Sequence, residues 1–391
     1  MAISKTGVAY IWGRNEDGQL GLGDTRNRYN PTPLTLPGGG AAIKGAACGA
    51  GHTLVWTTEG DLWAFGRNGF GQLGNDSQAE MVTSPIPVKG VGKVADAGVG
   101  RDFSVAVTEE GEVYTWGCPE YGQLGNGTNG EVLERAGKVT FNNVLAPVKM
   151  SFGREPPKVT QLAVGQHHTI AMDTEGKVWT WGFGGYGRCG HRDNVDCMRP
   201  RAVETFSAEP TPYQEMCGVE PNRALRVAAG AACCYVVTNV NALYFWGIAK
   251  RTGEAAMYPR LVDDVQGWNI RSVSSGFSST LIAGEKSLIS FGPSPTWGEL
   301  GYGPDGPKSS TRAEKVHSLE GNFVLALASG YGHSLAIIDT ETDAWDEEDV
   351  EVLELEECAA GAGGGGGGGA GAKRKAEAGG AAKGKKAKGK K

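Results

Sequence analysis

The 391-residue sequence lacks the features that would indicate a membrane protein or a secreted protein. No apolar run approaches the roughly 20 residues that a membrane-spanning helix needs. The first residues, MAISKTGVAYIWG, have no charged leader before an apolar stretch, so we expect no signal peptide. Eight cysteines in such a chain indicate reduced thiols in the cytosol or nucleus, and we expect no membrane partner.

Patterns for catalysis and for metal binding are also scarce. There is no Cys-x-x-Cys pair, although Cys189, His191 and Cys197 are close in sequence. The string GFGGYG fits GxGxxG, but no helix and no acidic ribose partner follow it. The spacing of serine, histidine and aspartate assembles no catalytic triad. We therefore expect no enzymatic active site, no cofactor and no metal, and we interpret the adjacent Cys233 and Cys234 as small buried apolar residues.

Positive charge is scarce in the body of the sequence and is concentrated at its end. From Glu341 onward there are 9 basic and 11 acidic side chains, which leaves 29 basic and 33 acidic ones before it. The acidic residues of this end come first, an uninterrupted glycine run follows at residues 363–369, and the basic residues come last. We predict a folded body at residues 1–338, an acidic and then glycine-rich linker at residues 339–372, and a disordered basic tail at residues 373–391.

Glycine is abundant, with 63 residues, and it recurs inside a repeated string. WGRNEDGQLGLGD begins at Trp12, FGRNGFGQLGND at Phe65 and WGCPEYGQLGNG at Trp116. Each later copy follows a segment such as CGAGHTLVWTTEGDLWAFG. The closing glycines of these segments are 53, 51, 65, 65 and 45 residues apart along the series Gly13, Gly66, Gly117, Gly182, Gly247 and Gly292. The repeating unit is therefore about fifty residues long.

Each unit predicts antiparallel β-strands. An apolar run at residues 54–56 is broken by TTEG, and the aromatic residues Trp63 and Phe65 then fall two apart, on one face of a strand. A small sheet buries such a face only by stacking on the next sheet. We therefore predict an all-β fold, a β-propeller with six units. The chain begins with a later half-unit and its body ends with an earlier half-unit, so we expect residues 9–12 to pair with residues 334–338 and close the ring.

The strings WGRNEDGQLGLGD and CGAGHTLVWTTEG resemble the repeat of the regulator of chromosome condensation family. The resemblance runs from about Gly7 to Ile338 and implies a β-propeller, which has seven blades in the family. Six units are counted here. Either the ring closes with six blades, or an N-terminal blade is missing from this sequence.

Members of this family bind the small GTPase Ran through a rim of loops and help to release its nucleotide. By this resemblance, the rim residues expected to bind a GTPase are Glu16, Arg101, Asp102, Gln166, His167 and Tyr331. An ordinary solvated loop is the alternative interpretation for each of them. His52, His168 and His333 follow a turn glycine by three residues, and we interpret them as structural histidines.

The resemblance further implies a monomeric nuclear protein, partly cytoplasmic or associated with chromosomes or the spindle, with a role in cell-cycle progression. We expect it to bind a small GTPase of the Ran, Rac or Ral type and to act like a guanine-nucleotide exchange factor. A chromatin or spindle adaptor without exchange activity is the alternative. The basic tail predicts a nuclear localisation signal or a DNA-binding arm formed by Lys373, Arg374, Lys375, Lys383, Lys385 and Lys386.

Overall fold

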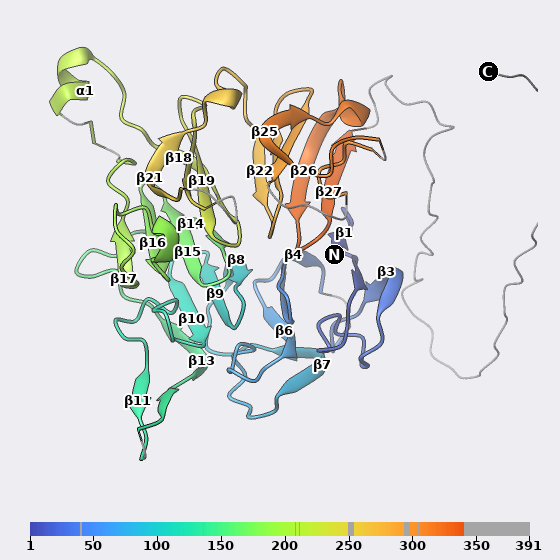
Figure 1. The fold of residues 1–391 in the computed structure, drawn as a ribbon. Helices are drawn as coiled ribbons and strands as arrows, with labels where there is room; N and C mark the ends of the chain where they lie inside the picture. The colour runs from blue at the N-terminus through green and yellow to red at the C-terminus, as the bar shows by residue number, and fades with distance from the viewer. Residues whose placement is uncertain are drawn as a thin grey trace, which may run out of the picture. The chain divides into compact units, whose positions relative to one another are not determined.

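The structure is a computed structural model that describes residues 1–339 apart from residues 40, 136, 208, 211, 249–253, 293–297 and 304. Within these residues nearly all regular structure is β-strand, in small antiparallel sheets arranged as the blades of a propeller (Figure 1). The predicted all-β propeller is confirmed. The predicted linker, apart from Asp339, and the six basic residues of the predicted tail signal lie outside the described residues.

Five of the sheets have four strands each. In chain order they consist of β4 (Ile43–Cys48), β5 (His52–Thr57), β6 (Leu62–Arg67) and β7 (Met81–Pro87); β8 (Val94–Val99), β9 (Phe103–Thr108), β10 (Val113–Gly117) and β13 (Val144–Lys149); β14 (Val159–Val164), β15 (His168–Asp173), β16 (Val178–Gly182) and β17 (Cys197–Ala202); β18 (Ala224–Ala229), β19 (Cys233–Thr238), β20 (Leu243–Gly247) and β21 (Ala256–Leu261); and β22 (Ser272–Ser275), β23 (Thr280–Ala283), β24 (Leu288–Gly292) and β25 (Ser310–Lys315). The first strands of successive units contact one another from β4 through β8, β14, β18 and β22 to β26 (Phe323–Ser329). These six inner strands agree with the six units counted in the sequence.

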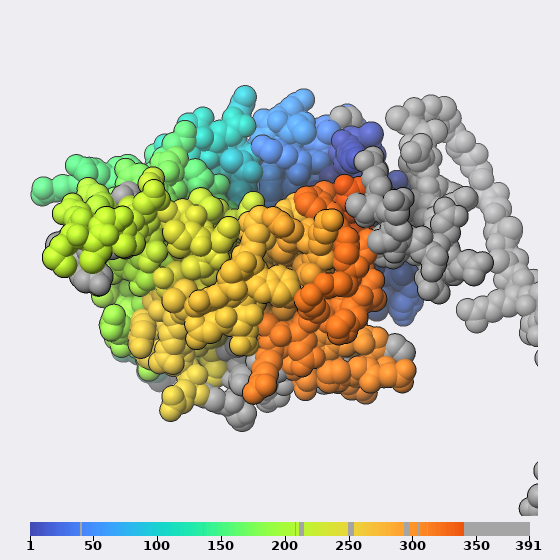
Figure 2. All heavy atoms as spheres, turned by 90° about the horizontal axis from the view of Figure 1, so that it is seen from above, coloured from blue at the N-terminus to red at the C-terminus, as the bar shows by residue number. Residues whose placement is uncertain are grey.

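Two smaller sheets come from the two ends of the described chain. One contains β1 (Ala2–Ile3), β2 (Ala9–Gly13) and β3 (Arg28–Leu34), and the other contains β26 and β27 (Ser334–Asp339). Both views place the two sheets side by side (Figures 1 and 2). The expected pairing of residues 9–12 with residues 334–338 is not formed between them, because β1 occupies that edge of β2. β1 and β2 form a local hairpin. Its turn is closed by a hydrogen bond from the N–H of Ser4 to the carbonyl oxygen of Val8 at 2.8 Å.

Residues 127–157 and residues 202–221 are long insertions in the repeating unit, and each contains short secondary structure of its own. The insertion at residues 127–157 contains the hairpin of β11 (Glu131–Leu133) and β12 (Val139–Phe141) before the chain returns to β13. The insertion at residues 202–221 contains the short helix α1 (Pro212–Cys217). Three single 3-10 turns, η1 (Gly185–Gly187), η2 (Asp263–Val265) and η3 (His317–Leu319), complete the regular elements described.

The repeated tryptophan and GQLG strings interlock neighbouring blades. Trp116 on β10 is fully buried, and its indole Nε1–H donates a hydrogen bond to the main-chain oxygen of Gln72, in the loop of the preceding unit, at 2.8 Å. The same bond joins Trp181 to Gln123 at 3.0 Å. The glycine that ends GQLG is required here: Gly74 has a φ of 66°, and a Cβ atom at this position would lie 2.7 Å from the indole nitrogen of Trp116. The repeat therefore encodes contacts between blades.

The hydrophobic core lies between consecutive sheets. Leu54, Leu73 and Trp116 belong to one buried cluster between the sheet that begins with β4 and the sheet that begins with β8. Phe103, Val105 and Trp181 belong to the cluster between the sheet that begins with β8 and the sheet that begins with β14. Because every sheet buries one face against its neighbour, the loops that join the strands are held in register around the propeller.

Candidate functional site

The predicted rim residues lie in the turns that join the first two strands of each unit. In all six turns the N–H of the turn glycine donates to the carbonyl oxygen three residues later, as Gly100 does to Phe103 at 2.9 Å. The two residues between these positions are held at the tip of a tight turn by the strands on either side. The sequence pattern therefore fixes which two side chains each unit presents at this end of the blade.

Main-chain hydrogen bonds also connect one turn to the next. The N–H of Arg101 donates to the oxygen of Gln166 at 3.0 Å, and the N–H of Gln166 donates to the oxygen of Ala231 at 3.3 Å. The chain of bonds continues from Ala231 to Gly276 at 3.3 Å and from Phe277 to Gly330 at 3.1 Å. We call these connected turns, residues 100–102, 165–167, 230–232, 276–278 and 330–332, the turn rim. It brings Arg101, Gln166 and Tyr331 onto one arc.

Asp102 is the one carboxylate of the turn rim as defined by these residues, and it is largely withdrawn from water. Its side chain is 14% exposed, and its two nearest cations are Arg101, with Nε 3.5 Å from Oδ2, and Arg67, with a guanidinium nitrogen 3.9 Å from Oδ1. Oδ1 accepts no hydrogen bond within the described part of the chain. Burial raises the pKa of Asp102, and the charges of Arg67 and Arg101 oppose that rise. The site presents a desolvated carboxylate between two arginines.

His167 lies in the next turn and is packed among aromatic rings. Its ring centroid is 5.2 Å from that of Tyr121, edge to face, and 6.5 Å from that of Phe183. Burial, with smaller contributions from the charges of Arg101 and Arg188, lowers the pKa of His167 to about 4. The imidazole is therefore neutral near pH 7, so it contributes shape and hydrogen bonding to the rim.

Tyr331 and Glu16 have different surroundings. Tyr331 is 67% exposed and stacks on Phe277, which is 44% exposed, with ring centroids 4.3 Å apart. Glu16 is exposed and pairs with Arg14 at 2.6 Å. Its loop is joined to the turn between β4 and β5, because the side-chain amide of Gln19 donates to the oxygen of Ala50 at 3.3 Å. That turn is not one of the five of the turn rim, so Glu16 lies outside the rim, in an ion pair of its own.

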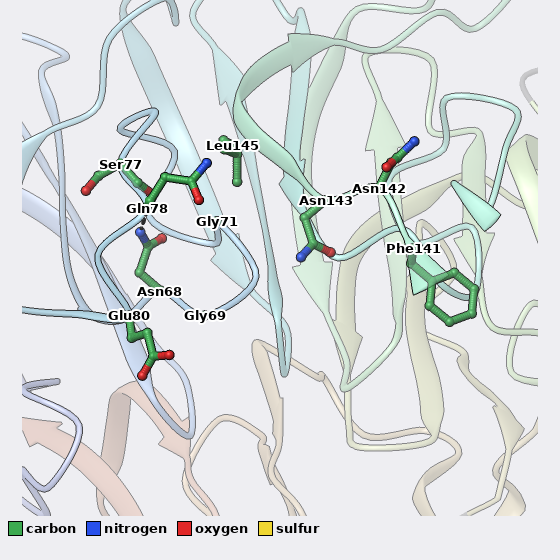
Figure 3. A pocket seen from close by; sticks show the side chains of 10 residues that line it. All are labelled: Asn68, Gly69, Gly71, Ser77, Gln78, Glu80, Phe141, Asn142, Asn143 and Leu145. Atoms are coloured by element: carbon green, nitrogen blue, oxygen red, sulfur yellow. Dashed lines mark hydrogen bonds between the residues drawn. The ribbon is translucent and has the colours of Figure 1, made fainter. Parts of the chain in front are cut away.

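A polar groove opens at the loop that follows Arg67, the arginine that approaches Asp102. It has a volume of about 510 Å³ and runs between the loop that follows Arg67 and the segment before β13 (Figure 3). Asn68, Gln78 and Glu80 lie on one side of it, and Asn142 and Asn143 lie on the other. The amides and the carboxylate suit hydrogen bonding to a polypeptide or polar loop. The insertion at residues 127–157 therefore contributes a wall to this face.

Two of the three histidines that follow a turn glycine by three residues, His52 and His168, have structural hydrogen bonds. His52 Nε2 lies 2.9 Å from Ser104 Oγ, which donates its own proton to the oxygen of Gln72, so His52 Nε2–H is the donor. His168 Nε2 bonds to the oxygen of Cys233 at 3.4 Å. His333 is exposed. Within the described residues no group of three or more histidine, cysteine, aspartate or glutamate side chains is placed to hold a metal ion.

Comparison with known proteins agrees with this architecture. The family model of the RCC1-like domain matches residues 1–282. Protein RCC2 of Mus musculus is 40% identical over 361 residues, which cover 89% of this chain and 67% of that protein. The chain belongs to the RCC1-like domain family. The resemblance inferred from the repeated strings is thus confirmed.

Solved structures show the same fold at lower identity. The crystal structure of human WBSCR16 superposes with a TM-score of 0.71 and 21% identity, and it covers 87% of this chain and 84% of that one. The structure of Prp20p from Saccharomyces cerevisiae superposes with a TM-score of 0.66 and 23% identity, and it covers 86% of this chain and 80% of that one. No helix in the described residues is both long enough and apolar enough to cross a membrane.

Several residues of the site were not predicted from the sequence. Arg67 approaches Asp102, and Tyr121 and Phe183 enclose His167, although none of them lies in a turn after a turn glycine. All three lie in loops or strand ends just before a GQLG-type string. Phe277, opposite Tyr331, occupies the same turn position as Arg101 and Gln166, so the repeat alignment carried the signal for it.

Proposed function

We propose that this propeller binds a small GTPase of the Ran, Rac or Ral type through the turn rim and promotes the release of its nucleotide. The observation that carries the proposal is the desolvated carboxylate of Asp102, which has an oxygen without a hydrogen bond and lies between two arginines on a rigid, connected rim. A partner that reaches the exposed part of this carboxylate would gain a charge-assisted hydrogen bond in a site that holds little water. Exposed aromatic and arginine side chains on the same arc are typical of binding hot spots.

Such a protein makes and breaks no covalent bond. It accelerates nucleotide release by binding the empty GTPase more tightly than the loaded one, and the nucleotide weakens its binding by the same factor. A rigid scaffold suits this role, because a rim that is already ordered loses little conformational entropy on binding. The hydrogen bonds between the turns supply that order.

The solved relative from yeast supports the kind of partner. That structure is described together with the binding of Prp20p to Gsp1p and to histones. For the present chain we take the GTPase as the partner of the rim. We take chromatin or DNA as the partner of the basic tail at residues 373–391, and the nucleus as the site of action.

The test of the rim proposal is an exchange assay with the full chain. Ran, Rac and Ral are each loaded with a fluorescent GDP analogue, and release is followed with and without the protein. We expect faster release from one of the three and binding of its nucleotide-free form in a pull-down. Binding without acceleration would support the adaptor alternative, and no binding to any of them would refute the proposal.

The tail proposal has a separate test. A tagged chain that ends at residue 371 should lose nuclear accumulation and salt-sensitive DNA binding relative to the full chain. If the shortened chain remains nuclear, the body or a partner directs it there.

A further inference from the structure

The loop between β16 and β17, residues 183–196, packs against the outer strand of the next unit, outside the turn rim and the polar groove. In this loop the N–H of Arg192 donates to the oxygen of Met257, on β21, at 2.8 Å. The same contact is made in three earlier units, by Gly23 to Thr83 at 2.8 Å, by Asp76 to Leu145 at 3.1 Å and by Gly127 to Met198 at 2.7 Å. Arg192 therefore occupies a defined position of the repeat.

The backbone of Arg192 is in the left-handed region. All four residues at this position of the repeat have a positive φ, which is 83° at Gly23, 55° at Asp76, 91° at Gly127 and 68° at Arg192. Glycine adopts such a φ freely, whereas an arginine adopts it only at an energetic cost. A strained residue at a position where the fold accepts glycine points to a use for its side chain.

The side chain of Arg192 meets a second arginine at one tyrosine ring. The Cζ atom of Arg192 lies 4.8 Å from the centroid of the Tyr258 ring, and that of Arg260 lies 5.1 Å from the same centroid. All three side chains are exposed, and Tyr258 and Arg260 lie two apart on β21, so they share one face of that strand. We call Arg192, Tyr258 and Arg260 the Arg–Tyr site. It presents two guanidinium groups to solvent within reach of one anion.

The positive charge of the Arg–Tyr site has no paired carboxylate among the residues that the structure describes. Arg201, on the neighbouring strand β17, pairs with Asp193 at 3.6 Å. Neither Arg192 nor Arg260 forms an ion pair within the described ranges. The tyrosine ring attracts both cations, but the two like charges still repel each other. An anion bound to both guanidinium groups would remove that repulsion.

We propose that the Arg–Tyr site binds a phosphate monoester carried by a polypeptide, such as a phosphorylated serine, in addition to the GTPase bound at the turn rim. Arg192 and Arg260 donate to the phosphate oxygens, since the planar guanidinium group matches phosphate in geometry and charge. Such a group offers a charge of about −1.5 to −2 and three acceptor oxygens at one point. The sequence before Glu341 has 29 basic and 33 acidic side chains, so the body lacks the surplus of positive charge that favours a nucleic acid.

The experiment measures retention of the full chain on two immobilised peptide libraries that differ only in a central phosphoserine or serine. Salt at about 0.3 M weakens the many-charge contacts of the basic tail most steeply, and the tail is the same in every variant. We expect retention to be about tenfold greater on the phosphoserine library, with elution by inorganic phosphate before chloride of equal ionic strength. Equal retention on the two libraries would overturn the proposal.

Variants assign the binding to the Arg–Tyr site. Arg192→Gly introduces the residue found at Gly23 and Gly127, so it should remove about nine-tenths of the phosphoserine-dependent retention without lowering the thermal unfolding midpoint. Arg260→Gln should cause the same loss, and Arg201→Gln, the same change at the paired arginine, is the matched control and should leave retention unchanged.

Retention that is unchanged in Arg192→Gly and Arg260→Gln, or that falls equally in Arg201→Gln, would overturn the proposal. If the first two variants instead weaken retention only on a single-stranded DNA resin, the site binds nucleic acid and the assignment to a phosphorylated polypeptide is wrong.

Discussion

Asp96 on β8 is expected to destabilise the propeller at neutral pH, and replacing it with asparagine should stabilise the protein. Its Oδ1 accepts a hydrogen bond from the N–H of Ala97 at 2.9 Å, and its Oδ2 accepts one from the N–H of Leu162, on the inner strand of the next unit, at 3.4 Å. Gln161 makes the equivalent bond one unit later, where its Oε1 accepts from the N–H of Val227 at 3.2 Å. A neutral amide therefore already performs this inter-blade contact elsewhere in the ring.

The magnitude follows from the pKa of the carboxyl. Burial raises the pKa of Asp96 from 3.8 to about 6, against the opposing effects of its backbone hydrogen bonds and of Lys44. The folded chain thus holds this proton more tightly than the unfolded chain, so the contribution to stability is greatest below pH 4 and is lost as the pH rises to 6. A shift of about two units corresponds to roughly 3 kcal/mol. Because the side chain keeps partial contact with water, we expect about 1–2 kcal/mol.

The assay is urea unfolding of Asp96→Asn and of the parent chain from pH 4 to pH 8. The variant should gain about 1–2 kcal/mol of unfolding free energy at pH 8, and the gain should disappear near pH 4. Asp96→Ala is the control, because it removes the charge and also the acceptor for Leu162, and it should gain less than the asparagine variant. A gain that does not depend on pH, or a loss at pH 8, would refute the reasoning.

Two further predictions concern the contacts between blades. Gly74→Ala should lower the free energy of unfolding in urea by about 2–4 kcal/mol, because Gly74 has a positive φ and the added Cβ would meet the indole of Trp116. Gly69→Ala, in the same loop, is the control: a Cβ there meets no atom within 4 Å, so the change should be nearly neutral. Burial, with smaller contributions from Arg67 and Arg188, lowers the pKa values of His52 and His168 to about 3. Because the unfolded chain takes up protons at these histidines between pH 7 and pH 5 and the folded chain does not, the free energy of unfolding should fall by about 2 kcal/mol per histidine over this range. A glutamine at either position should remove its share of that fall, and an unchanged pH profile would show that the histidines titrate normally.

The repeat made most of the fold predictable. Because the aromatic residues and glycines recur at fixed positions in each unit, the sequence alone indicated sheets that stack and six units. The pairing at the ends was predicted wrongly, since the sequence pattern matched β2 to β27 by analogy with the other units. The short hairpin of β1 with β2 is a local interaction that carries no repeat signature, and it satisfies the same edge.

The candidate site was predictable in position and less so in its surroundings. The turn glycines placed Arg101, Asp102 and His167 on one rim, and the structure joins those turns by hydrogen bonds. The burial of Asp102 and the aromatic enclosure of His167 depend on side chains from adjacent units. Contacts of that kind are set by how the blades pack, which spacing along a single chain does not reveal.

The measurement that tests the central claim most directly is calorimetric binding of the nucleotide-free GTPase to the parent chain and to Asp102→Ala. Glu110→Ala, an exposed change at the opposite end of the same sheet, serves as the matched control, and circular dichroism confirms folding. If the rim binds the GTPase through this desolvated carboxylate, Asp102→Ala should weaken binding by about 2–5 kcal/mol while Glu110→Ala leaves it unchanged. Equal affinity of all three proteins would contradict the assignment of the turn rim as the GTPase-binding surface.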